Sequence, residues 1–449
     1  MRIKLSDHFG YRKLAKFTLP TVAMMVFVSV YGVVDGLFIS NFVNETAFTA
    51  VNFVWPLLMI LGAFGFMLGT GGSALISKTL GEGDEKLANK LFSMFLYVSI
   101  ALGVALAVVM GLLLPTLLRA MGAEGQMLAD CITYGRLILC ALPAQILQFE
   151  FQSFFVTAEK PTYGFWYTLA AGLTNIALDA LFVVGFHWGI AGAAIATGMS
   201  QLVGGLLPLM YFMRRKNSSL LRCGKMYFNG RAFWQACLNG ASEFLANIAM
   251  SVVSILYNLQ LMRYAGEPGV AAYGVLMYVN FTFLSCFIGY SVGVAPIIGF
   301  NFGAKNSEEL KNVLSKSLKI IAVGAVAMLA LAQIFARPIS YIFVGYNSEL
   351  LEMTVRGFQI FSFGFLFAGW TIYASSFFTA LNNGLISAII SFARTLVCEV
   401  IAVLALPTLF QALGGNPLDG IWASIVIAEV VALIVSVIML LTHRKRYNY

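Results

Sequence analysis

Six acidic residues stand inside long apolar stretches of this chain. They are Asp35, Glu150, Asp179, Glu243, Glu399 and Glu429, and one base, Arg394, joins them. An ionised carboxylate in a hydrocarbon environment is costly unless it is paired, coordinated or protonated. Acids in membrane segments typically bind ions, relay protons or contact substrates. These acids are therefore the candidates for the chemistry of this protein.

Two of the acids are predicted to lie at the same depth. Counted from the nearest expected external turn, Asp35, Asp179 and Thr197 are eight or nine residues deep, which places them roughly 12 Å below the outer surface. Asn175 is one helical turn from Asp179 and shares its face. Two carboxylates, an amide and a hydroxyl can bind a small cation or share a proton. Alternatively, Asp179 and Asn175 cap a kinked helix and hydrogen-bond each other.

The other charged residues allow a cargo site or an ion pair. Glu150 and Glu243 each lie about ten residues from a cytoplasmic end, near the midplane, where either can attract a cationic ligand. Glu399 and Glu429 lie at comparable depths. Arg394 is about a turn and a half from Glu399 and can neutralise it. For this possible polar pair, a satisfied buried ion pair and a functional role remain equally open.

Aromatic residues near these acids are candidates for a substrate cleft. We single out Phe154, Tyr257, Tyr278 and Tyr373 because the faces of aromatic rings attract organic cations. The alternative for each ring is packing between helices, which is the commoner use of aromatic residues in membrane helices.

The composition indicates a polytopic membrane protein. The 449 residues are 60% hydrophobic and only 11% charged, whereas a soluble domain has about 25% charged residues. The basic N-terminus precedes a long apolar run without a cleavage site, so we expect a retained first helix. The six cysteines are scattered, without a CxxC pair. We therefore expect no disulfide framework, no structural metal and no enzymatic cofactor.

Apolar runs separated by polar breaks predict twelve membrane spans. They cover residues 14–43, 47–79, 89–116, 130–158, 161–187, 190–213, 232–264, 268–303, 309–343, 354–380, 385–411 and 418–442. Of the 28 lysines and arginines, 22 fall on the side of the two termini. Because cytoplasmic loops are enriched in these residues, both termini are predicted to be cytoplasmic, in the cell's inner (plasma) membrane. The net charge of +8 then faces the lipid surface, and no nucleic acid is expected.

The chain also repeats itself at a fixed interval. Gly293 and Gly303 follow Gly71 and Gly81 by 222 residues. Each half has six spans, so the repeats are parallel and are related by an axis along the membrane normal. We expect an all-α protein of two pseudo-symmetric six-helix bundles, 1–213 and 232–449, with a basic cytoplasmic linker, 214–231, and a central cleft. In this repeat Ile255 stands roughly opposite Asp35, so we do not expect a second ion site.

These features resemble the multidrug and toxic compound extrusion (MATE) family over nearly the whole chain. The first span has its P-x14-D pattern at Pro20 and Asp35. The segment GTGGSALISKTLGEGD (Gly69–Asp84) is similar to the family's G-x-G-x-S-x-L-I-S-x-x-L-G-x-G-D. Asn175-x3-Asp179, followed by Gly192-Ala193-Ala194 and Thr197, resembles its span five to six signature.

The resemblance implies roles for several of these residues. Asp35, Asn175, Asp179 and Thr197 would form the cation site of the N-terminal bundle. Tyr31 would respond to protonation of this site, and Pro20 would be the hinge of the first helix. The pattern is closest to the bacterial drug-exporting branch of the family. Span ten lacks the acid of the sodium-coupled relatives, and Glu243 in span seven replaces it only in part, which leaves H⁺ and Na⁺ both open as the coupling ion.

We therefore expect a secondary antiporter that exports bulky organic compounds, often cationic, in exchange for H⁺ or Na⁺, and that acts as a monomer in the bilayer. The alternative is a flippase for a lipid-linked saccharide, which needs a basic cavity, whereas the midplane charges here are mainly acidic. An enzyme is not expected, because the three histidines lie near span ends and no HExxH motif occurs. The absence of a GxxxxGK[ST] loop argues against ATP as the energy source.

Overall fold

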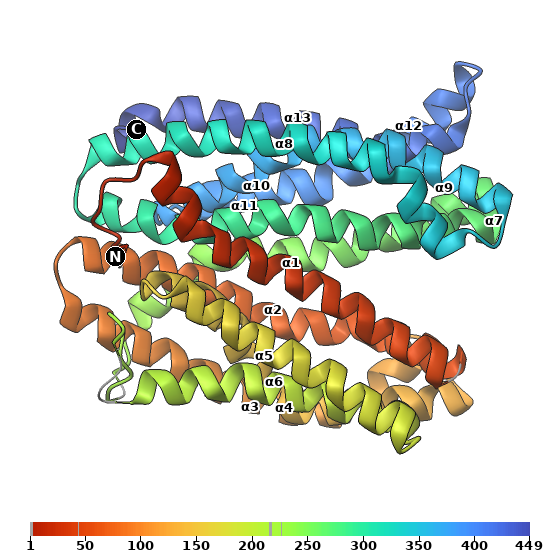
Figure 1. The fold of residues 1–449 in the computed structure, drawn as a ribbon, viewed down its shortest axis with the longest axis horizontal. Helices are drawn as coiled ribbons and strands as arrows, with labels where there is room; N and C mark the ends of the chain where they lie inside the picture. Colours follow the sequence, from red (N-terminus) through yellow and green to blue (C-terminus); the bar gives the residue numbers. More distant parts are fainter. Residues whose placement is uncertain (1–2, 44, 215–217, 226) are drawn as a thin grey trace.

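The computed structural model describes residues 3–43, 45–214, 218–225 and 227–449, and every regular element in these ranges is helical. The helices run side by side along one axis (Figure 1). They are α1 (Tyr11–Phe42), α2 (Glu45–Gly81), α3 (Glu85–Ala120), α4 (Gly125–Thr157), α5 (Pro161–Asp179), η1 (Ala180–Gly185), α6 (Gly189–Met213), α7 (Gly230–Gly303), α8 (Ser307–Val344), α9 (Ser348–Phe361), η2 (Ser362–Gly364), α10 (Phe365–Ala380), α11 (Gly384–Phe392), η3 (Ala393–Cys398), α12 (Glu399–Ala412) and α13 (Pro417–Tyr447).

The described helices supply twelve membrane crossings. Eleven continuous helical segments are long and apolar enough to cross a bilayer. One of them, α7, has 74 residues, which makes it roughly 110 Å long if straight, several times the thickness of a bilayer core. Gly266, with φ 66° and ψ −156°, breaks this helix into two crossings between the predicted spans 232–264 and 268–303. The predicted all-helical membrane fold is therefore confirmed.

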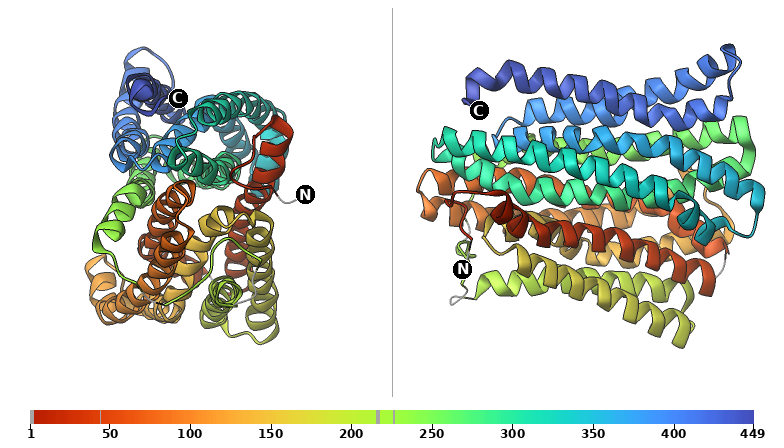
Figure 2. Two further views of the ribbon diagram at one scale, coloured as in Figure 1. Left: turned by 90° about the vertical axis from the view of Figure 1, so that its left-hand side faces the viewer. Right: turned by 45° about the horizontal axis from the view of Figure 1, so that its top comes forward.

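Helices from the two halves of the chain form two groups that meet along α1, α2 and α7 (Figure 2). Close contacts between the groups need glycine. A Cβ on Gly81 of α2 would overlap the carbonyl oxygen of Phe300, and a Cβ on Gly303 of α7 would overlap that of Lys78. Gly303 follows Gly81, and Phe300 follows Lys78, by the same 222 residues. The two contacts are thus related by the predicted pseudo-two-fold symmetry.

A second set of contacts obeys the same relation. Gly240 of α7 packs on Met67 of α2, and Gly289 of α7 packs on Thr21 and Val22 of α1. Since Gly289 follows Met67 by 222 residues, the interval holds for the helix cores. Position 257 is then the equivalent of Asp35. The sequence comparison placed Ile255 there, which is wrong by two residues because insertions shift its register.

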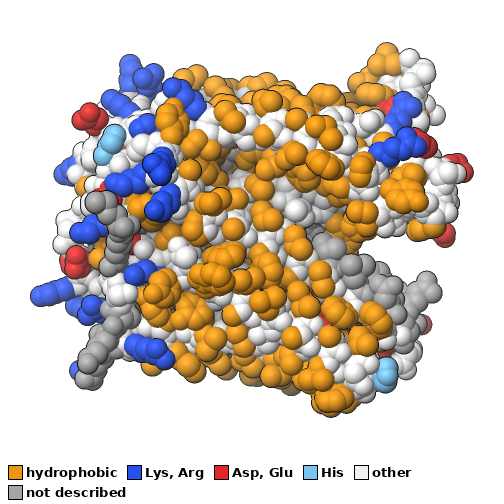
Figure 3. Space-filling model, in the orientation of Figure 1, with side chains coloured by type: hydrophobic (Ala, Val, Ile, Leu, Met, Phe, Trp, Pro, Cys, Tyr) orange, Lys and Arg blue, Asp and Glu red, His pale blue; other side chains and the backbone are white. Residues whose placement is uncertain are grey.

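Basic side chains gather at one end of the molecule. This end, called the basic end below, is formed by the starts of α1, α3 and α8 and the ends of α2, α6 and α13, and it carries both termini. Lysine and arginine side chains cluster there in the space-filling view, whereas the opposite end has few (Figure 3). At that opposite end the surface is indented between the two groups of helices. The glycine contacts of Gly81 and Gly303 lie at the basic end, so the two groups are closed there.

Candidate functional site

The four polar residues that the sequence places at one depth are brought together by α1, α5 and α6. The carboxyl of Asp35 interacts with the side chains of Asp179, Asn175 and Thr197. The amide of Asn175 donates a hydrogen bond to the Thr197 hydroxyl, at 3.4 Å. Asn175, Asp179 and Thr197 are buried, and Asp35 is partly buried. We call these four residues the acid-pair site.

The backbone changes its geometry at Asp179. This residue ends α5, and the next six residues form the π-helical segment η1. Single π-helical turns within α-helices are frequent at functional sites. The predicted helix irregularity is present, but the alternative that Asn175 and Asp179 bond each other does not hold, because the Asn175 amide bonds Thr197 instead.

The acid-pair site has a surplus of negative charge. Among the described residues, no donor hydrogen-bonds to either carboxyl oxygen of Asp179 or to Oδ1 of Asp35. Two adjacent carboxylates in a poorly solvated site repel each other, so one proton or one cation is needed to neutralise them. No cluster of three or more His, Cys, Asp or Glu side chains within the described ranges is placed to hold a metal ion.

Two further residues of this site carry no charge and were not selected from the sequence. Tyr134 of α4 is fully buried beside Thr197 and near both acids. Gln148, also on α4, hydrogen-bonds to Tyr31 of α1, which lies beside Asp35. Both are polar residues within an expected apolar span. A search for all buried polar residues, rather than for charged ones only, would have found them.

The second half of the chain holds a separate charged cluster. Arg394, on the π-helical segment η3, forms an ion pair with Glu429 of α13, in which both Nε and Nη2 lie 2.7 Å from Oε1. Thr371 of α10 donates a hydrogen bond to the other oxygen of Glu429, at 3.0 Å. Glu243 and Glu399 lie near the same guanidinium. Arg394 therefore pairs with Glu429 rather than with Glu399, and three acids surround one base.

Comparison with known proteins identifies the family. The MatE family model matches residues 20–181 and 244–404, more than half of the chain. The chain belongs to the MatE family. This result confirms the predicted resemblance. It also supports the prediction that the chain is a membrane transporter and not an enzyme.

Relatives of this MatE protein cover nearly its whole length. It is 27% identical to the multidrug export protein MepA of Staphylococcus haemolyticus, over 97% of this chain and 94% of the relative. It is 25% identical to the same-named protein of Staphylococcus saprophyticus, with equal coverage. A solved structure titled as the outward-facing conformation of a multidrug resistance MATE family transporter has a TM-score of 0.90, with 23% identity over 98% of this chain and 97% of that one. A MATE structure in the straight conformation has a TM-score of 0.89 and one in the bent conformation 0.85.

Two of the six predicted cleft residues lie at or near an open surface. Tyr278, on the second crossing of α7, is 40% exposed and is close enough to Asp35 to sense its charge. Glu243, on the first crossing, is partly buried beside Arg394. These two residues and the acid-pair site face the region between the two groups of helices.

The other four predicted cleft residues are buried in helix packing. Glu150 is fully buried and faces Ser99 of α3. Phe154 packs edge-on against Phe92 in the same region. Each of these side chains points into its own helical group rather than toward the other group.

The two tyrosines among these four lie in the second half. Tyr257 stacks on Tyr273 at 4.9 Å and hydrogen-bonds to Ser424. Tyr373 is 1% exposed beside Tyr290. Packing, the alternative given for these rings, describes their positions in this conformation.

Pro20 lies where the first helix meets the second half. Helix α1 continues through it without a break. Its neighbours Thr18 and Val22 pack against Gly293 and Gly289 of α7. One helix thus carries both Asp35 and a major contact between the two groups.

Proposed function

We propose that this MatE protein is a secondary transporter that exports bulky organic compounds, many of them cationic, in exchange for H⁺ or Na⁺. The observation that carries the proposal is the acid pair, in which Asp35 and Asp179 are adjacent and no described basic side chain neutralises them. An ion that enters this site removes the repulsion and changes the charge of α1. The names of the MepA relatives, which describe multidrug export, support the cargo class.

Helix α1 links ion binding to the conformational change. An ion drives transport only if the two conformations hold it with different affinities. Asp35 sits on the same helix as Thr18 and Val22, which pack on α7 of the other group. Pro20 lacks a backbone donor, and this weakens the helix between the two sites. Neutralisation of Asp35 therefore changes the shape of α1 and, with it, the contact between the groups.

The two groups of helices act as the moving units of an alternating-access cycle. We assign residues 1–213 and 232–449 to these units and 214–231, part of which lies outside the described residues, to the linker between them. The glycine contacts at the basic end close one side, and the indentation at the other end opens outward (Figure 3). Both termini and the basic end face the cytoplasm of a cell whose plasma membrane the protein spans as a monomer.

Cationic cargo fits the charges of the region between the groups better than an anionic one. Glu243 and Glu399 have only Arg394 as a basic neighbour, and that residue is bonded to Glu429. A lipid-linked saccharide carries a pyrophosphate, which these carboxylates would repel. The flippase alternative is therefore not favoured.

The proposal is tested by transport in proteoliposomes with separately imposed H⁺ and Na⁺ gradients. Export of an organic cation such as ethidium should follow one of these gradients and should not need ATP. Cargo movement that depends on neither gradient would contradict the proposal.

A further inference from the structure

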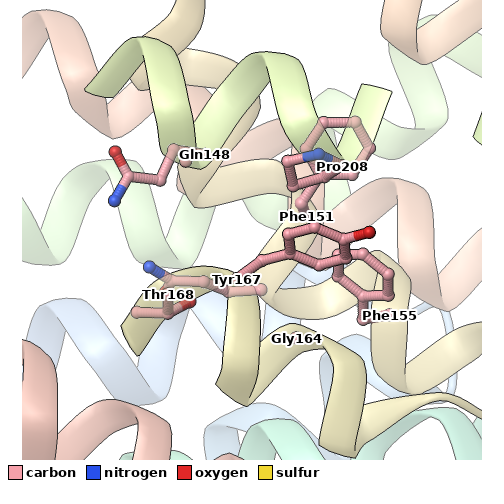
Figure 4. A pocket seen from close by; sticks show the side chains of 9 residues that line it. Gln148, Phe151, Phe155, Gly164, Tyr167, Thr168 and Pro208 are labelled. Atoms are coloured by element: carbon pink, nitrogen blue, oxygen red, sulfur yellow. The ribbon is translucent and has the colours of Figure 1, made fainter. Parts of the chain in front are cut away.

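A small cavity lies between α4, α5 and α6, on the basic-end side of the acid-pair site (Figure 4). The polar side chains that line it are Gln148, Gln152 and Thr168, and the aromatic ones are Phe151, Phe155 and Tyr167. Space for it exists because residue 204 of α6 is a glycine, where a Cβ would lie 2.6 Å from Cδ of Gln148. We call this space the amide cavity.

The amide cavity is lined by amides that lack protein partners. Gln148 and Gln152 are 5% and 3% exposed, and they stand one helical turn apart on the same face of α4. Among the described residues, neither polar atom of the Gln152 side chain has a hydrogen-bond partner. A buried amide without partners is unfavourable unless water reaches it. The cavity is therefore suited to hold water.

One end of the amide cavity is linked to the acid-pair site. Gln148 hydrogen-bonds to Tyr31, whose ring lies beside Asp35. Besides Tyr31, the titratable groups that face Asp35 are Asp179 on α5, Tyr134 on α4 and Tyr278 on α7. Only the Tyr31 branch leads into the cavity.

The other end of the cavity leads toward the basic end of the molecule. Tyr167 lines the cavity, stacks on Phe155 at 5.4 Å and interacts electrostatically with Arg214, which follows the last residue of α6. Tyr163, one turn before Tyr167, is 42% exposed. The cavity thus lies between the acid-pair site and the surface of the basic end, closed by two stacked rings.

We propose that the amide cavity is a route for protons between the acid-pair site and the cytoplasm, separate from the region that the cargo crosses. The inference rests on the proposed antiport function, and it deepens that function by assigning H⁺ as the ion. Asp35 releases its proton and becomes a carboxylate. Along Tyr31 and the cavity waters, each O–H bond that breaks is replaced by one formed with the incoming proton, and water at the basic end takes up the last proton. Gln148 is a positioning residue, since it holds Tyr31 and water in line.

The cavity is too small for any organic cargo, and its polar groups come from one helical group only. Hence protons can leave the site while the contact between the groups stays closed. A hydrated Na⁺ ion does not fit this route, because it would have to shed its water and pass two stacked aromatic rings.

The proposal is tested with Gln148→Leu and Gly204→Ala in proteoliposomes that contain an internal pH-sensitive dye. Ethidium is the cargo. Leucine keeps the size of Gln148 but cannot position water, and the alanine methyl group displaces Gln148. We expect ethidium-driven proton flux to fall by at least about tenfold in both variants. Ethidium binding should stay within about threefold of the wild type, because the cavity does not touch cargo.

Two further measurements separate a proton route from a structural role. Gln145→Leu is the matched control, because this buried amide on the same helix faces Gly62 of α2 and not the cavity; we expect normal flux. Replacement of H₂O by D₂O should slow Gln148→Leu more than the wild type, because proton transfer becomes rate-limiting. Gln148→Asn, which keeps an amide, should recover part of the flux.

Three outcomes would overturn the proposal. The first is normal proton flux in Gln148→Leu and Gly204→Ala. The second is an equal loss in Gln145→Leu, or a loss of ethidium binding that matches the loss of flux. The third is wild-type export that follows Na⁺ alone, which would leave the antiport function standing and remove only the proton route. Absence of any gradient-driven export in the wild type would instead defeat the antiport function itself, and the route with it.

Discussion

Replacement of Asp35 by asparagine should uncouple the transporter while leaving it folded. Two unit charges roughly 5 Å apart at an effective dielectric constant of about 20 repel each other by about 3 kcal/mol. In the acid-pair site this repulsion strengthens the binding of one neutralising proton or cation by roughly 200-fold. Asparagine removes the charge but keeps the size and the polar contacts of Asp35. The ion gradient then has no charge left to act on at this residue.

We expect gradient-driven ethidium export by Asp35→Asn to fall at least about 100-fold, following the lost ion affinity. Ethidium binding should stay within about tenfold of the wild type, since the fold and the region between the groups are retained. Purified protein should be reconstituted at equal amounts, and binding and export should be measured on the same vesicles.

The matched control for Asp35→Asn is Glu150→Gln. Glu150 is also a buried acid of the first half, but it faces Ser99 and not the acid pair. It should therefore export at close to the normal rate. Asp179→Asn should behave like Asp35→Asn, and the double variant should be little worse than either, because adjacent residues of one site are not additive. Near-normal export by Asp35→Asn would refute the assignment and direct attention to Glu243, Glu399 and Glu429.

Three other predictions concern closure, cargo and orientation. Gly303→Ala should favour opening of the basic end, because its methyl group meets the Lys78 carbonyl; distances between spin labels across this end should lengthen, whereas Gly111→Ala, with open space around it, should leave them unchanged. Glu243→Gln should weaken the export of permanent cations by several-fold more than that of neutral dyes, as compared in competition assays, and equal losses would argue for a structural role. A cysteine at the exposed Ser218 should resist impermeant thiol reagents in intact cells, and its labelling would reverse the proposed orientation.

Patterns that depend on counting along the chain were sufficient to predict much of this fold. Hydropathy and the distribution of basic residues depend only on residue type and spacing, and they led to twelve crossings. Depth is also a matter of counting, since each helical residue rises by about 1.5 Å. Asp35, Asn175, Asp179 and Thr197 were therefore correctly expected to lie together.

Properties that depend on helix rotation and partner choice could not be predicted in this way. Glu150 lies at a reasonable depth for a cargo site but points toward α3. Arg394 has Glu399 nearby on its own chain segment, yet it bonds Glu429 of another helix. A buried arginine selects the carboxylate that meets its planar fork with good geometry, and sequence spacing does not contain that information.

The contrast between symmetric contacts and asymmetric charge suggests how one ion can move both groups. The contacts of Gly81 and Gly303 are related by the two-fold symmetry, so each group contributes equally to closure at the basic end. The equivalent of Asp35 in the second half is Tyr257, a buried phenol that is already bonded to Ser424. No second acid pair therefore exists at the related position. The charge that changes during the cycle acts on α1 alone, and the symmetric contact with α7 transmits its effect to the other group.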